Sequence, residues 1–241
     1  MSELLQQEQE QSLVTEKKEG QALSWKTMIL FFLSFLGMSF AVGVIFGIIG
    51  GVTNNERLLN ALQGYVGLFI DALMFGIALL LFKKVRVFLR GSFDKKAIYE
   101  WKTYLYILLA IFITYAVQFI SFRVIGFENP EAQEKVMGLQ GAQSTFEFVL
   151  IGLAVILVTP IKEELLFRGV LHRFLEKKYH FYVGLVVSSI IFGLAHFGYP
   201  VNGAIIGVIT VVLYRLTQSL YTSIIYHVIW NAFVFSTLLL S

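Results

Sequence analysis

Long apolar stretches alternate along this chain with short polar segments. A helix needs about 20 residues to cross the roughly 30 Å of hydrocarbon in a bilayer, and seven of the stretches come close to or exceed this length. We therefore predict an all-α fold, a polytopic bundle of about seven transmembrane helices, or eight if one boundary is wrong. The stretches lie at residues 28–52, 61–82, 103–121, 147–167, 181–199, 201–218 and 220–240.

Composition supports a membrane protein and removes several kinds of chemistry. Of the 241 residues, 57% are hydrophobic and only 15% are charged, whereas a soluble domain of this length needs far more polar surface. The chain has no cysteine, so a disulfide framework, a thiolate metal site and a cysteine nucleophile are all excluded. The net charge of +3 is modest, and the basic residues stand beside apolar stretches. This pattern favours contact with a membrane surface and gives no support for nucleic-acid binding.

The density of basic residues alternates between the stretches and predicts the orientation. Residues 1–26 are rich in Gln and Glu and too polar to pack a core, so we expect a mobile cytoplasmic tail ahead of a transmembrane domain at 27–241. Segment 83–102 mixes basic and aromatic side chains and is expected to lie along the cytoplasmic surface. Basic residues also follow the fourth stretch, which should continue as an amphipathic helix to about residue 176. The positive-inside rule then places the amino terminus in the cytoplasm and the carboxyl terminus outside.

The sequence EELLFR, at residues 163–168, brings three ionisable groups together at the end of the fourth stretch. On a helix, Glu164 and Arg168 lie about 40° apart on one face and can form an ion pair. Glu163 points about 140° away from Arg168, so it has no local partner. A carboxylate left free in this way is a candidate general base or acid.

Two later stretches carry polar residues at the same helical spacing. In FGLAHF, Phe192 and His196 are four residues apart, and in YHVIWNAF, His227 and Asn231 are four apart. A lone histidine in an apolar helix is more often a hydrogen-bonded packing residue than a catalyst. His227 and Asn231 are harder to explain by packing, and together they offer N–H donors that can hold a developing oxyanion. Because three stretches each contribute such groups, the set is a hypothesis for a functional site.

Other polar residues have simpler interpretations. The alternative to a site is that the fourth helix enters the interface here, so that Lys162, Arg168 and Arg173 extend toward water. Asp71 is interpreted as a buried hydrogen-bonding residue in preference to a proton or ion site. His172 and His180, in the basic segment after the fourth stretch, are expected to be solvated.

The three motifs together resemble a known family. EELLFR fits EExxxR, FGLAH fits FxxxH and HVIWN fits HxxxN. In this order, on successive late helices, they resemble the CAAX prenyl endopeptidases and bacteriocin-processing enzymes, also called the CPBP or Abi family. Each motif alone is weak evidence, whereas all three in order within transmembrane stretches are specific. The resemblance covers roughly residues 147–235, and the first three stretches match only as generic membrane helices.

The resemblance implies an intramembrane endopeptidase that hydrolyses a peptide bond in a membrane-associated or lipidated peptide or protein tail. Glu163 would act with His196 to activate a water for attack on the peptide carbonyl. His227 and Asn231 would form the oxyanion hole. The partners would be this substrate and membrane lipids, and the location a multi-pass position in the cell membrane, specifically a bacterial plasma membrane.

The resemblance also implies that Glu164 with Arg168 braces the site, and it leaves metal dependence open. Glu163, His196 and His227 could ligate zinc with one open position. However, the HExxH motif is absent from the chain. Since the Ras-converting branch of the family is regarded as using a glutamate without a metal, no cofactor is favoured.

The predicted topology creates one conflict within this site. Glu163 falls toward the cytoplasmic side, whereas His196 falls near the outer end of the fifth stretch. The two can meet only if the fifth helix is tilted, or if the joint GYPVNG at 198–203 dips into the bundle. A joint exposed to lipid is forbidden, but one that lines a watery cavity is allowed.

Two functions other than proteolysis fit the same sequence. One is a non-catalytic immunity or scaffold protein of the same fold, although retention of all six polar motif residues counts against it. The other is a proton-coupled transporter that uses Asp71, Glu163 and Glu164, which the lack of an internal repeat disfavours. The sequence does not identify the substrate, the cleavage site, a lipid requirement or the oligomeric state.

Overall fold

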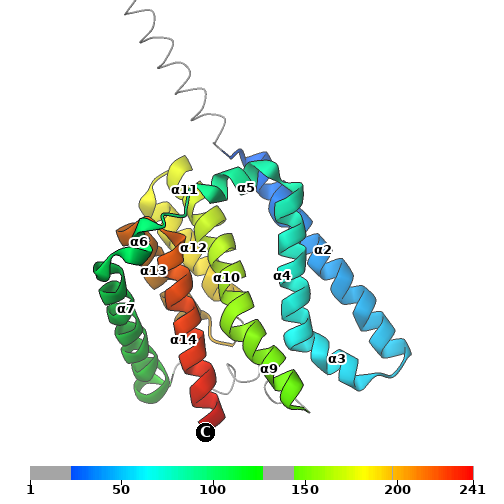
Figure 1. Ribbon diagram of the computed structural model, residues 1–241. Helices are drawn as coiled ribbons and strands as arrows, with labels where there is room; N and C mark the ends of the chain where they lie inside the picture. Colours follow the sequence, from blue (N-terminus) through cyan, green and yellow to red (C-terminus); the bar gives the residue numbers. More distant parts are fainter. Residues whose placement is uncertain (1–22, 127–143, 197, 241) are drawn as a thin grey trace, which may run out of the picture.

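The computed structural model describes residues 23–126, 144–196 and 198–240, and every regular element in these ranges is a helix (Figure 1). Each of the seven predicted stretches contains helix, which confirms the all-helical fold. Most of the predicted tail at 1–26 lies outside the described residues. The α-helices are α2 (Trp25–Val52), α3 (Glu56–Gln63), α4 (Tyr65–Leu81), α5 (Lys83–Arg90), α6 (Lys96–Tyr99), α7 (Trp101–Phe119), α9 (Thr145–Leu153), α10 (Thr159–Glu163), α11 (Arg173–Lys178), α12 (Phe181–Ala195), α13 (Pro200–Thr217) and α14 (Leu220–Leu240), and π-helical segments are η1 (Ile120–Ile125), η3 (Ala154–Val158) and η4 (Glu164–His172).

Several helices are suited to crossing a membrane. By length and composition, four segments of the described chain qualify, and the pair α3 and α4, bent by 56°, makes a fifth if it is counted as one span. The chain is therefore consistent with a multi-pass membrane protein, while the number seven and the cytoplasmic amino terminus stay predictions. The four segments are Trp25–Val52, Trp101–Arg123, Thr145–Lys178 and Pro200–Thr217.

The basic segments gather at one end of the bundle. Figure 1 shows the start of α2, the whole of α5 and α11 at the same end. Helix α5 is amphipathic, because Val85, Phe88 and Leu89 are buried while Lys83 and Lys84 are exposed. The predicted surface segment therefore lies across the end of the bundle with its charges outward, as an interfacial helix does.

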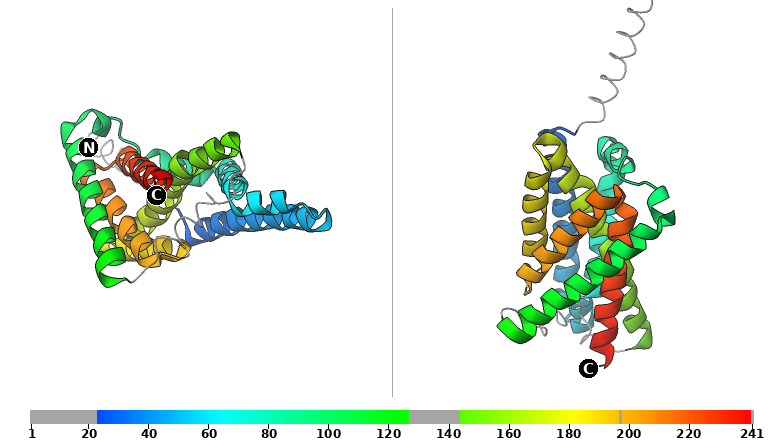
Figure 2. Two further views of the ribbon diagram at one scale, coloured as in Figure 1. Left: turned by 90° about the horizontal axis from the view of Figure 1, so that it is seen from below. Right: turned by 90° about the vertical axis from the view of Figure 1, so that its left-hand side faces the viewer.

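Helix α2 is attached to the rest of the bundle by aromatic packing on α4. Phe31 and Phe35 of α2 are buried, and both rings meet Phe75 edge to face, with centroids 6.0 and 5.6 Å apart. Edge-to-face pairs add to the free energy gained from burial. Figure 2 shows the opposite end of α2, with α3, projecting from the body of the molecule.

The segment from α9 to α11 is one long helix interrupted by two π-helical segments. The backbone N–H of Thr159 reaches back five residues to the carbonyl of Ala154. Continuing this pattern, residue 160 would donate to the carbonyl of Val155, but Pro160 has no N–H. The carbonyl of Val155 is therefore open to a donor from another helix. The second segment, η4, begins at Glu164, so the motif EELLFR spans the junction between α-helix and π-helix.

Helix α12 is shorter than the predicted fifth stretch. It has 15 residues, which at a rise of about 1.5 Å per residue is about 22 Å, less than the roughly 30 Å of a bilayer core. It ends at Ala195, and the chain turns back into α13 at Pro200. In Figures 1 and 2, this joint lies higher than the lower end of α14. The early end of α12 places His196 at this turn, where its Nε2 lies 3.9 Å from Oε2 of Glu163, so the two residues meet although their predicted depths differ.

Close contact between α12 and α13 depends on glycine. A Cβ atom at Gly193 would lie 2.4 Å from the carbonyl oxygen of Pro200, and one at Gly203 would lie 3.0 Å from Cβ of His196. The GAIIG pattern in α13 is thus an interface, whereas a Cβ atom at Gly43 or Gly47 in α2 would meet nothing within 4 Å. The glycines bring the two helices together and hold His196 at the turn.

We expect Gly193→Ala to lower the free energy of unfolding by about 1–3 kcal/mol, because the new methyl group meets backbone that cannot move aside. The same shift moves His196, so the activity proposed below should fall as well. Thermal unfolding of the purified protein measures the first effect. Gly76→Ala in α4, where the space around the glycine is empty, is the matched control and should not destabilise the protein. Equal stability of both variants would contradict the prediction.

Candidate active site

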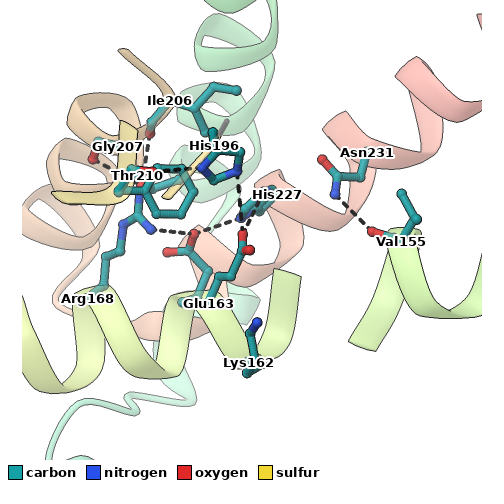
Figure 3. Close-up of polar contacts among 12 residues, drawn as sticks. Val155, Lys162, Glu163, Arg168, His196, Ile206, Gly207, Thr210, His227 and Asn231 are labelled. Atoms are coloured by element: carbon teal, nitrogen blue, oxygen red, sulfur yellow. Dashed lines mark hydrogen bonds and ion pairs between the residues drawn. The ribbon is translucent and has the colours of Figure 1, made fainter. Parts of the chain in front are cut away.

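Residues from three helical regions converge on one carboxylate (Figure 3). Glu163 ends α10, His196 follows α12 directly, and His227 lies in α14. Nε2 of His196 and Nε2 of His227 each lie 3.9 Å from Oε2 of Glu163. Side chains from these three regions therefore surround a common point.

Glu164 lies in a buried ion cluster beside this point. Its Oε1 is 3.2 Å from Nη1 of Arg168 and 2.8 Å from Nδ1 of His227, and the exposed fractions of Glu164 and Arg168 are 0% and 1%. The predicted pair of Glu164 with Arg168 is confirmed. The guanidinium also lies 4.0 Å from the ring centroid of Phe192, so the first residue of FGLAH contacts the last residue of EELLFR. Burial of these charges is tolerated because each has a partner.

The hydrogen bonds of the two histidines fix which ring nitrogen faces Glu163. Nδ1 of His196 is 2.7 Å from the carbonyl oxygen of Phe192, and because a carbonyl only accepts, Nδ1 carries the proton. His227 donates from Nδ1 to the carboxylate of Glu164. In their neutral forms, both rings therefore turn an Nε2 lone pair toward Glu163. Oε2 of Glu163 and the two Nε2 atoms are then three acceptors that face one another, and such an arrangement requires protons or a positive charge between them.

These groups line a cavity with a volume of about 470 Å³. Its size is in the range of pockets that hold small ligands, about 300–1,000 Å³. Apolar side chains form most of its wall, and the polar groups are concentrated near Glu163. Wall residues outside the motifs include Phe35 and Leu36 of α2, Leu68 and Asp71 of α4, Lys162 of α10 and Trp230 of α14.

The region that contains these residues matches a known family model. Residues 145–233 match the model of the type II CAAX prenyl endopeptidase Rce1-like family. This part of the chain, from α9 to α14, is therefore similar to the Rce1-like family. Comparison with curated proteins and with solved structures finds no match. The resemblance seen in the three motifs is thus supported by the match, which covers residues 145–233 and is to a family of CAAX-type endopeptidases.

Within the matched region, Asn231 has a hydrogen-bond partner on another helical segment. It lines the cavity, and its Nδ2 donates to the carbonyl of Val155 over 2.9 Å (Figure 3). This is the carbonyl left open by Pro160. An amide nitrogen has two hydrogens, so one N–H can stabilise the break in the helix while the other points elsewhere.

The two tasks of Asn231 can be separated by mutation. Asn231→Ala should lower stability by about 1–3 kcal/mol, because it leaves the carbonyl of Val155 unpaired. Combined with Pro160→Ala, which supplies a new N–H at position 160, the variant should regain stability. Peptide cleavage should stay reduced by about 10²–10³ in both variants if the second N–H holds an oxyanion. Thermal unfolding and a cleavage assay on both variants measure this, and recovery of cleavage with stability would show that Asn231 acts only through the helix.

The sequence analysis missed an ion pair in the cavity wall. Nζ of Lys162 lies 2.5 Å from Oδ2 of Asp71, and the other oxygen of Asp71 accepts from Ser39 over 2.9 Å. Asp71 is hydrogen-bonded, as predicted, but its side chain is 30% exposed and carries an ion pair. Lys162 does not simply extend toward water. Since 91 residues separate the partners, no spacing rule could connect them.

The histidines of the following segment differ from one another. His172 was expected to be solvated, but its exposed fraction is 0%, and its ring meets Phe181 and Tyr214 edge to face. His180, in contrast, is exposed. Arg173 is also buried and donates to the carbonyls of Phe88 and Gly91. The prediction for His172 is wrong, and the alternative in which Arg173 extends toward water does not hold, because both side chains are buried at the end of the bundle.

The spacing of the side chains in the matched region can be compared with that of a metal site. In the described part of the chain, no group of three or more His, Asp or Glu side chains is arranged to hold a metal ion. The ligand set suggested by sequence, Glu163 with His196 and His227, has 3.9 Å between its facing atoms. Bonds of about 2.0–2.1 Å in a tetrahedron bring such atoms closer than this. As placed, these residues do not fit zinc, and we derive no step through a metal.

Proposed function

We propose that the protein is an intramembrane endopeptidase that hydrolyses a peptide bond near the end of a membrane-associated or lipidated peptide or protein tail. One observation carries the proposal: Glu163 and two imidazole nitrogens face a common point in a cavity of the predicted transmembrane domain. The Rce1-like match supports the reaction class.

The attacking group is a water between Glu163 and His196. Atoms 3.9 Å apart can both lie about 2.8 Å from one water oxygen, which is hydrogen-bond distance. The water donates its two hydrogens to these acceptors, and both of its lone pairs then remain available for attack. Glu163 acts as general base and His196 orients the water.

The bond changes balance without a further reactant. The water oxygen bonds to the peptide carbonyl carbon, its proton passes to Glu163, and the carbonyl π electrons move to oxygen. When the C–N bond breaks, the nitrogen takes the proton from Glu163 and leaves as an amine. The other product keeps the new carboxyl group, and Glu163 returns to its starting state.

The oxyanion is stabilised by His227 and the second N–H of Asn231. His227 donates from Nε2 when its ring is protonated. The buried carboxylate of Glu164, 2.8 Å from Nδ1, stabilises that charge, as the aspartate of a serine-protease triad does. Arg168 holds Glu164 in place from the other side. Donors fixed in advance need no reorganisation during the reaction.

The direct test is cleavage of a peptide panel by the purified protein, with and without a strong chelator. The panel contains lipidated and unmodified peptides with the same sequences, and mass spectrometry identifies the products. Cleavage that resists chelation supports water activated by Glu163. Cleavage lost on chelation and restored by zinc would replace this mechanism with a metal held by Glu163, His196 and His227.

The same panel separates the alternatives. A scaffold or immunity protein of this fold would cleave no member of it. A proton-coupled transporter would show a flux that survives removal of His227 and Asn231. No contact among the described residues favours transport, since Glu164 is enclosed by Arg168 and His227 and Asp71 is paired with Lys162.

A further inference from the structure

The ion pair of Lys162 and Asp71 is part of the cavity wall and is not used by the proposed mechanism. Lys162 directly precedes Glu163, and both side chains line the same cavity. The side chains of Lys162 and Asp71 are 13% and 30% exposed. A lysine ammonium group thus lies in the same cavity as the candidate catalytic carboxylate, at a position that a bound peptide can reach.

Asp71 can release this cation without losing all its partners. Oδ2 of Asp71 lies 2.5 Å from Nζ of Lys162, while Oδ1 accepts the hydroxyl hydrogen of Ser39. If Lys162 turns away, Asp71 keeps the hydrogen bond from Ser39 and remains partly exposed. Lys162 has a flexible four-carbon stem and three donors, so its ammonium group can exchange one carboxylate for another.

The pair differs from the buried pair of Glu164 with Arg168. Both members of that pair are at most 1% exposed and do not line the cavity, so it can only brace the helices. Lys162 and Asp71 both face the cavity. A cation placed there can contact a ligand, and a small, mostly apolar cavity makes a charged hydrogen bond to that ligand strong.

We propose that Lys162 binds the free C-terminal carboxylate of the peptide substrate, which displaces Asp71. This inference rests on the proposed function and makes Lys162 a specificity-determining residue. Because Lys162 is next to Glu163 and the cavity is only about 470 Å³, the carboxylate lies a few residues from the cleaved bond.

The test compares free-acid and amide forms of one peptide pool. The probe is a pool of fluorescently labelled tetrapeptides with apolar central residues, made once with a free C terminus and once as the amide. Binding is measured by fluorescence anisotropy on the full-length Glu163→Gln protein, which does not consume the probe. We expect about tenfold tighter binding of the acid, the size of a charge-assisted hydrogen bond.

Three variants, each made on the same Glu163→Gln protein, identify the residue responsible. Lys162→Met should bring the ratio of acid to amide affinity close to one, and Lys162→Arg should keep most of the preference. Asp71→Asn should increase the preference, because it removes the competing carboxylate. If the pair of Lys162 and Asp71 only braces the helices, the result should differ. Lys162→Met and Asp71→Asn would then change the affinities for the acid and the amide equally and in the same direction.

The outcomes separate this inference from the proposed function. Equal affinity for acid and amide, no binding of either form, or a preference that survives Lys162→Met overturns the inference. Cleavage of the same pool by the unmutated protein tests the protease separately. If that protein cleaves acid and amide equally well, the function stands and the inference fails. A preference that depends on Lys162 without any cleavage supports carboxylate binding and contradicts the protease.

Discussion

Glu163→Gln should reduce the rate of peptide cleavage by about 10²–10⁴, the range expected for loss of a general base. The amide is nearly the same size as the carboxylate but cannot accept the proton of the attacking water. The rate should fall through kcat, because the peptide still enters the same cavity. A cleavage assay at saturating peptide measures the effect.

The structure supplies the controls for this substitution. Glu163 is not part of the pair between Glu164 and Arg168, so thermal unfolding of the variant should differ little from that of the unmutated protein. Glu100→Gln, in the exposed joint between α6 and α7, is a matched loss of one carboxylate away from the cavity and should leave cleavage unchanged. If Glu163→Gln cleaves as fast as Glu100→Gln, the catalytic assignment is wrong.

Arg168→Met should be the most destabilising single change, with a loss of about 3–5 kcal/mol in the free energy of unfolding. It leaves the fully buried carboxylate of Glu164 with His227 alone. The contact of the guanidinium with the ring of Phe192 is lost as well, so EELLFR and FGLAH no longer contact each other through this pair. Thermal unfolding of the purified protein checks the size of the effect.

Two comparisons show whether the cause is the uncompensated charge. The double variant Glu164→Gln/Arg168→Met removes both charges and should be more stable than Arg168→Met alone. Arg215→Met breaks the pair with Glu176, whose N–O distance is 3.0 Å, but Arg215 is 55% exposed, so the loss should be below about 1 kcal/mol. Similar losses for Arg168→Met and Arg215→Met would contradict the role given to the buried cluster.

Interactions within one helix could be predicted from the sequence. The pair of Glu164 and Arg168 follows from a spacing of four, and the apolar stretches locate the helices because their length is set by the bilayer. The motifs also identified which helices should meet. These features depend on residues near one another in the chain, or on a family pattern.

Contacts between helices could not be predicted. The ion pair of Lys162 with Asp71 joins residues that are 91 positions apart in the chain, and the hydrogen bond from Asn231 to Val155 joins residues that are 76 positions apart. The second contact exists because Pro160 interrupts a π-helical pattern, which no residue spacing indicates. The early end of α12 was missed because its apolar composition continues past Ala195, while the turn is set by tight packing of Gly193 on Pro200.

The short helix α12 also bears on which side of the membrane each terminus is predicted to lie. Because α12 has only 15 residues, α12 and α13 can be counted either as two crossings or as one hairpin that returns to its starting side. The two counts differ by two crossings, so the number of crossings is odd in both cases. In the predicted topology, the end of α11 and the start of α14 share one side in both cases, and the carboxyl terminus is expected opposite the amino terminus for seven crossings as well as for five.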